Sequence, residues 1–104
     1  MTKVHGLRIA EDGAVTDVTL EGFRDYQAAV GGLIECVQLR CGDMYVNEEG
    51  LLENLETNPF ASYIASMLIV GPAVFVGECD DEGNNTSISP AWRDDLIFIT
   101  ENMK

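Results

Sequence analysis

The chain has 104 residues, of which 46% are hydrophobic, and its 18 acidic and 6 basic side chains give a formal net charge of −12. This length favours one domain over residues 1–104, and this apolar content allows a packed core, which argues against a disordered chain. The acidic balance disfavours direct binding to nucleic acid, whose phosphates need a basic face, and no apolar run reaches the length of a membrane span.

The first third of the chain predicts a β-hairpin followed by a short helix. Within residues 3–10, Leu7 and Ile9 share one face with Arg8 between them, and apolar and polar side chains alternate over residues 14–20. The Glu-Asp-Gly sequence between the two segments is typical of a tight turn. Residues 22–30 then carry apolar side chains at helical spacing. A Gly-Gly pair follows them, which suits the end of a helix because glycine accepts the left-handed conformation.

A second hairpin is predicted from residues 33–40 and 43–47, because a short Cys-Gly break separates two strand-like segments. Residues 47–50, Asn-Glu-Glu-Gly, indicate a turn, since asparagine and glycine both tolerate positive φ. Residues 51–56 have leucines at helical spacing in a short segment, so a helix and a loop both remain open there.

The next segment predicts a helix and a buried strand. Asn58 followed by proline is a strong helix start, and the apolar side chains of residues 60–68 form one helical stripe. Residues 69–77 are mostly apolar and β-branched, as in a strand covered on both sides. Pro72 predicts that this strand lies at a sheet edge or carries a bulge, because proline cannot donate to the ladder.

The C-terminal part predicts a polar loop over residues 78–87 and a terminal helix. Ser89 followed by proline repeats the capping pattern, and residues 91–103 carry apolar side chains at helical spacing, although residues 96–100 also resemble a strand. We favour the helix. Together these elements predict a small α+β domain with an antiparallel or mixed sheet of about five strands and two or three packed helices.

No metal site or catalytic constellation is indicated. The single histidine, His5, and the three cysteines lack the close spacing of a structural zinc site. We therefore expect Cys36, Cys41 and Cys79 to be buried free thiols of a cytoplasmic protein, in agreement with the lack of a secretion signal. Residues 78–89 resemble a calcium loop only in their first half, because the final position is not an acid. With no nucleophile–base pair and no phosphate loop, we expect no enzyme and no cofactor.

The acidic side chains are unevenly distributed. Between residues 41 and 92 the chain has nine carboxylates and no lysine or arginine, whereas the rest of the chain has nine acids and all six bases. A surface with such a charge attracts basic partners, although a solvated face or adaptation to high salt also accounts for it. The candidate binding residues are Glu48, Glu49, Glu53, Glu56, Asp80, Asp81 and Glu82.

Several motifs, in this order, are similar to those of a known family. They are GLIECVQL at residues 32–39, YVNEEG at residues 45–50, Leu52 and Leu55, Asn58 with Ala61, and IVGPAV at residues 69–74 with Gly77. Over residues 28–83 the chain thus resembles a small domain of unknown function carried by phages and mobile elements. The resemblance implies an accessory protein of a mobile element, and it implies no agreed activity and no catalytic residues. Glu56 stands where the family's motif commonly has proline.

The leading hypothesis is a non-enzymatic protein whose acidic face occupies the basic surface of a nucleic-acid-handling host protein, as a phage-borne inhibitor of host defence would. Its carboxylates would stand where phosphates bind, so affinity would fall as salt rises. One alternative is a small-ligand or nucleotide-signal binding protein, with a pocket between the Asn58 helix and the strands. Another is a homodimeric structural module of unknown role.

Overall fold

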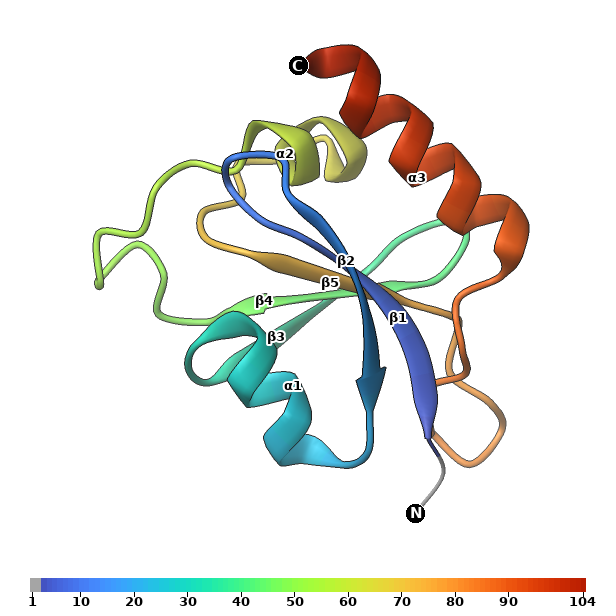
Figure 1. Ribbon diagram of the computed structural model, residues 1–104. Helices are drawn as coiled ribbons and strands as arrows, with labels where there is room; N and C mark the ends of the chain where they lie inside the picture. Colours follow the sequence, from blue (N-terminus) through green and yellow to red (C-terminus); the bar gives the residue numbers. More distant parts are fainter. Residues whose placement is uncertain (1–2) are drawn as a thin grey trace.

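The structure is built on a five-stranded antiparallel sheet with the strand order β2-β1-β5-β4-β3 (Figure 1). It is a computed structural model and describes residues 3–104. In chain order the elements are β1 Val4–Ile9, β2 Val15–Leu20, α1 Phe23–Val30, β3 Ile34–Gln38, β4 Asp43–Asn47, α2 Pro59–Ala65, β5 Ala73–Val76 and α3 Pro90–Met103. The predicted α+β class and both predicted hairpins are confirmed.

Helices cover both faces of the sheet. On one face α2 and α3 pack over a cluster that includes Leu7, Met44 and Phe75, and the ring of Phe75 meets that of Trp92 edge-on with centroids 5.7 Å apart. On the other face α1 covers a smaller cluster, in which the rings of Tyr26 and Tyr45 meet at 4.8 Å. All four side chains of β5 are fully buried because this central strand is covered on both faces, as the apolar run predicts.

The predicted edge position of Pro72 is wrong. β5 lies at the centre of the sheet, and Pro72 comes directly before it, where the ladder does not require the N–H group that proline lacks. The preceding residue, Gly71, has a φ of +76°, so the chain turns there and the strand begins at Ala73 instead of at residue 69.

The helix starts are as predicted, but α2 is shorter than its apolar stripe indicates. Asn58 caps α2 and Ser89 caps α3, and each accepts a hydrogen bond from a backbone N–H in the first turn. Ser66 adopts the left-handed conformation with a φ of 56°, so α2 ends at Ala65. Met67 and Leu68, which the stripe places on the buried face, are therefore carried past the helix end and exposed.

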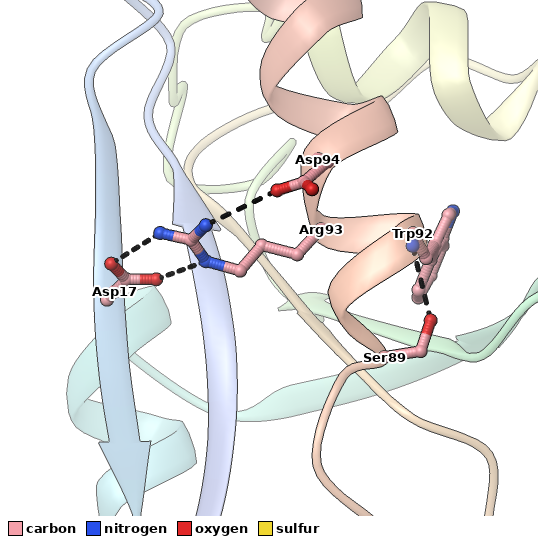
Figure 2. A network of polar contacts seen from close by, with 5 residues as sticks. All are labelled: Asp17, Ser89, Trp92, Arg93 and Asp94. Carbon is pink, nitrogen blue, oxygen red and sulfur yellow. Dashed lines mark hydrogen bonds and ion pairs between the residues drawn. The ribbon is translucent and has the colours of Figure 1, made fainter.

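The terminal segment forms the favoured helix, α3, and an ion pair joins its first turn to the outer strand β2. Arg93 donates two hydrogen bonds of 2.8 Å to the carboxylate of Asp17, and Asp94 lies 3.6 Å from the same guanidinium (Figure 2). Trp92 and Leu96 face the core, as the spacing predicts, but the next buried position is Thr100 and not Met103.

The expectation of buried thiols is wrong. Cys36, Cys41 and Cys79 are all exposed and free. Cys36 lies on the edge strand β3, and Cys41 lies in the turn between β3 and β4, so neither position is covered by a helix. Apolar composition around a cysteine indicates a strand but not which side of the strand is covered.

Candidate binding surfaces

The acidic residues proposed from the sequence lie at two opposite ends of the sheet. β4 and β5 run antiparallel, with Asp43 opposite Val76, so the loop after β4 and the loop after β5 leave the sheet in opposite directions. Figure 1 shows the first loop on the left and the second at the lower right. All of these carboxylates are exposed: Glu48, Glu49, Glu53 and Glu56 follow β4, and Asp80, Asp81 and Glu82 follow β5.

The turn between β1 and β2 adds carboxylates to the first group. Ile9 pairs with both Ala73 and Val15, so this turn leaves the sheet at the end where β5 begins, close to the loop after β4. Glu11 and Asp12 of the turn line a hollow of about 200 Å³ together with Glu56. We call this group the acidic end, and it consists of Glu11, Asp12, Glu48, Glu49, Glu53 and Glu56.

Asn47 holds the loop of the acidic end in place. This side chain is 5% exposed, and its Oδ1 accepts a hydrogen bond of 2.8 Å from the backbone N–H of Glu49. Its Nδ2 donates to Oε1 of Glu53 at 2.9 Å and to the carbonyl of Val30 at 3.4 Å. One buried amide therefore fixes the loop backbone and orients a carboxylate on the surface.

The backbone of the loop is also hydrogen-bonded to itself and to its neighbours. The N–H of Leu55 donates to the carbonyl of Gly50, and the N–H of Gly71 donates to the carbonyl of Glu56. Asn54 has a φ of 56°, which interrupts any helix in residues 51–56 and settles the choice that the leucine spacing leaves open. The carboxylates are thus presented on a series of turns and not on a free segment.

Asn58 anchors the base of the acidic end. Its side chain is fully buried, and its Oδ1 accepts from the N–H of Ala61 at 3.0 Å. Its Nδ2 donates to the carbonyls of Ile9 and Gly71 at 3.0 and 2.9 Å. This amide therefore links the end of β1, the start of α2 and the approach to β5.

Few positive charges are close to the acidic end. Lys104 pairs with Glu101 at 3.0 Å, and the Nε of Arg8 donates to the carbonyl of Ala29 while sharing a hollow with Glu53. Within residues 3–104, no ion pair involves a carboxylate of the acidic end. These carboxylates remain available to a partner's cations.

The loop after β5 closes a pocket on the α1 face. Asp80 Oδ1 accepts from the N–H groups of Glu82 and Asn84 at 2.9 Å each, which folds the loop back. The pocket has a volume of about 410 Å³ and lies on the face opposite α2, not beside the Asn58 helix as proposed from the sequence. Its lining residues are Val4, Leu20, Gly22, Phe23, Tyr26, Ile34, Tyr45, Gly83, Asn84 and Asn85.

A polar network supports the wall of this pocket. The hydroxyl of Tyr45 donates to Asn85 Oδ1, and Asn85 Nδ2 donates to the carboxylate of Asp43 at 3.0 Å. The thiol of Cys79 donates to the same carboxylate at 3.2 Å, and this bond raises the pKa of Cys79. Partial burial raises the pKa of Tyr45, and loss of solvent around the thiol raises the pKa of Cys36 although that residue as a whole is exposed. These groups therefore stay protonated at neutral pH, which disfavours nucleophilic chemistry at the two thiols.

Neither a metal cluster nor a membrane helix is found in the part of the chain that the structure describes. No three His, Cys, Asp or Glu side chains of residues 3–104 gather in a group that could hold a metal ion. None of the helices in the same range is long and apolar enough to cross a membrane. The candidate sites are therefore the acidic end and the pocket on the α1 face.

Comparison with known proteins gives one match. The family model DUF3846, described as a domain of unknown function, matches residues 3–97. No curated protein and no solved structure matches the chain. The motifs at residues 28–83 lie within the matched range, and the family's description names no activity.

Proposed function

The chain belongs to the DUF3846 family, and we propose that it is a non-enzymatic binding protein whose acidic end occupies a basic surface of a nucleic-acid-handling protein. The observation that carries this proposal is the convergence of carboxylates from the β1–β2 turn and the loop after β4 at one end of the sheet. Asn47 and the turns around it hold that loop, so a partner does not have to order it.

The mechanism is competition with nucleic acid. Duplex DNA carries about one charge per 1.7 Å of its axis, and proteins bind it through lysine and arginine side chains. Carboxylates that occupy the same cations exclude the phosphates, and their attraction weakens as salt screens the charges. The second group, Asp80, Asp81 and Glu82, points away from this contact and adds to the long-range attraction only.

We further propose that the partner is a defence protein of a host cell. A phage or mobile element that enters a cell meets restriction and other defence proteins, which bind nucleic acid through basic surfaces. A small cytoplasmic protein with a charge of −12 suits the inhibition of such a protein. The resemblance at residues 28–83 supports this setting.

The test compares two sets of four neutral substitutions. The first changes the acidic end, with Glu48→Gln, Glu49→Gln, Glu53→Gln and Glu56→Gln. The second changes the opposite loop by the same charge, with Glu78→Gln, Asp80→Asn, Asp81→Asn and Glu82→Gln. Each immobilised variant is exposed to a bacterial lysate at low salt, and bound proteins are eluted with short duplex DNA and identified.

We expect the wild-type chain and the second variant to retain basic nucleic-acid-binding proteins that duplex DNA elutes, and the first variant to lose them. Glutamine keeps the acceptor that Asn47 Nδ2 uses at position 53, so the loop stays folded in the first variant. If both variants lost the bound proteins equally, only net charge would matter. If duplex DNA eluted no protein from the wild-type chain at low salt, the proposal would be refuted.

The pocket on the α1 face supports a second candidate function, the binding of a small ligand. Its volume of about 410 Å³ and its mixture of tyrosine rings with asparagine amides are typical of small-molecule sites. A panel of nucleotides tested by thermal shift checks this candidate. A rise in melting temperature that Tyr26→Ala abolishes would support it, and no rise with any nucleotide would count against a nucleotide ligand.

A further inference from the structure

Large apolar side chains are exposed next to the acidic end. Leu51 and Leu52 of the loop after β4 are 69% and 81% exposed, and Met67 and Leu68 after α2 are 48% and 62% exposed. The two leucines lie on the turns of residues 51–56. Met67 and Leu68 follow the left-handed Ser66, where α2 has already ended. An apolar surface that a folded chain leaves in water marks an interaction site when its members are neighbours.

Three of these side chains meet at one groove. Leu51, Met67 and Leu68 line a groove of about 90 Å³ together with Val37 of the edge strand β3. Glu35 and Glu48 line the same groove, and Glu48 belongs to the acidic end. The groove therefore combines exposed apolar side chains with two carboxylates.

The carboxylates of the groove favour a basic partner. A second copy of this chain also carries −12, so a symmetric contact would bring two sets of carboxylates together without compensating cations. A segment with apolar side chains on one face and lysine or arginine beside them fits both parts of the surface. The exposed apolar side chains come from two separate segments, residues 51 and 67–68, and such a cluster suits one apolar face of a helix.

We propose that this groove docks a basic amphipathic helix of the partner protein, with its apolar face on Leu51, Met67 and Leu68 and its cations on Glu35 and Glu48. The inference rests on the proposed function, because it names the part of the basic partner that the acidic end meets. Charge brings the partner to the acidic end, and burial of the leucines fixes its position.

The experiment uses two synthetic peptides and fluorescence anisotropy. The first peptide is built of lysine and leucine, with the leucines at i, i+3, i+4 and i+7 so that they form one helical face. The second has the same lysines and a serine in place of each leucine. Both are titrated with the full chain at low salt and again at high salt.

The variant that tests the groove is Leu51→Ser with Leu68→Ser. Its matched control is Tyr63→Ser with Phe98→Ser, two side chains that are similarly exposed, at 66% and 68%, and that do not line the groove. All four side chains lie on the surface, so neither double substitution disturbs the core. We expect the groove variant to bind the leucine peptide about tenfold more weakly and the control to bind it as the wild-type chain does.

The outcomes separate this inference from the proposed function. Equal affinity for both peptides, with no effect of Leu51→Ser and Leu68→Ser, would overturn the groove and leave the acidic end as the site. Loss of binding on substitution of the leucines, with no effect of Glu49→Gln, Glu53→Gln and Glu56→Gln, which lie outside the groove, would keep the groove and refute the proposed function. If neither peptide bound at low salt, both the groove and the proposed function would be refuted.

Discussion

The loop after β4 and the loop after β5 are both acidic and exposed, and in each of them a polar side chain holds the backbone in place. The two loops differ in the residues that surround them. Asn47 holds the first loop, which meets further carboxylates from the β1–β2 turn and exposed leucines. Asp80 holds the second, which closes over the tyrosine pocket.

The difference shows that the number of charges does not define a binding surface. The two loops have equal numbers of carboxylates, and the first also meets the carboxylates of Glu11 and Asp12 and the exposed side chains of the groove. The second has neighbours that enclose a volume. We therefore propose a different kind of partner for each loop, and substitutions that affect one end and spare the other sharpen this comparison.

Asn58→Ala should have the largest effect on stability, because it removes the side chain that links β1, α2 and the approach to β5 below the acidic end. The carbonyls of Ile9 and Gly71 would lose buried donors and α2 would lose its cap, so we expect a loss of about 3 kcal/mol or more in the free energy of unfolding. Urea denaturation measures it. The control is Asn84→Ala in the opposite loop, whose side chain is exposed. A loss below about 1 kcal/mol for Asn58→Ala would contradict the anchoring role.

Asn47→Ala should loosen the first loop and leave the second unchanged. It removes the acceptor of the Glu49 N–H and the donor to Glu53, so amide hydrogen exchange should become faster over residues 49–55 and stay as before over residues 80–86. Asn85→Ala is the reciprocal change, because it frees Tyr45 and Asp43 at the pocket. If either substitution accelerated exchange in both loops, the two ends would not be independent.

Thr100→Val should leave stability unchanged or raise it by up to about 1 kcal/mol. The Thr100 side chain is fully buried on α3, and its hydroxyl has no hydrogen-bond partner within residues 3–104. Valine has the same shape without the polar group. Thermal denaturation provides the measurement, and Thr16→Val on the exposed side of β2 is the control. A clear loss of stability at position 100 would show that the hydroxyl is needed.

The smallest effect on stability is expected from Asp17→Asn on the outer strand β2. The hydrogen bonds from Arg93 lower the pKa of Asp17 below 3.8, so the pair stabilises the folded chain above the ordinary aspartate pKa, and this contribution is lost as pH falls through the lowered value. The melting temperatures of wild type and variant should differ slightly at neutral pH and converge in acid. A difference that grows in acid would contradict this sign.

Much of the fold could be predicted from the sequence because its signals are local. The turn at Asp12, the caps at Asn58 and Ser89, and the alternation in the two hairpins each depend on neighbouring residues only. The end of α2 could not be predicted, because a left-handed serine carries no sequence signal comparable to glycine. The central place of β5 depends on pairing between distant segments, and Pro72 is misleading because it lies just outside the ladder.

The arrangement of the candidate binding residues could be predicted only in part for the same reason. The acids of residues 48–56 are visible as a run, but their meeting with Glu11 and Asp12 depends on the register of β1 with β5. The apolar spacing of residues 60–68 predicts burial for Met67 and Leu68, and only the early end of α2 turns them into surface. The separation of Asp80, Asp81 and Glu82 from the other carboxylates is likewise a property of the sheet.

The most direct test of the central claim is a map of backbone amide chemical shifts in the wild-type chain as the lysine and leucine peptide is added. We predict that the changes concentrate at residues 11–12, 35–37, 48–56 and 67–70, which form the acidic end and the groove beside it. Changes concentrated at residues 78–86, or spread evenly over every acidic residue, would contradict the claim that one end of the sheet binds the basic partner.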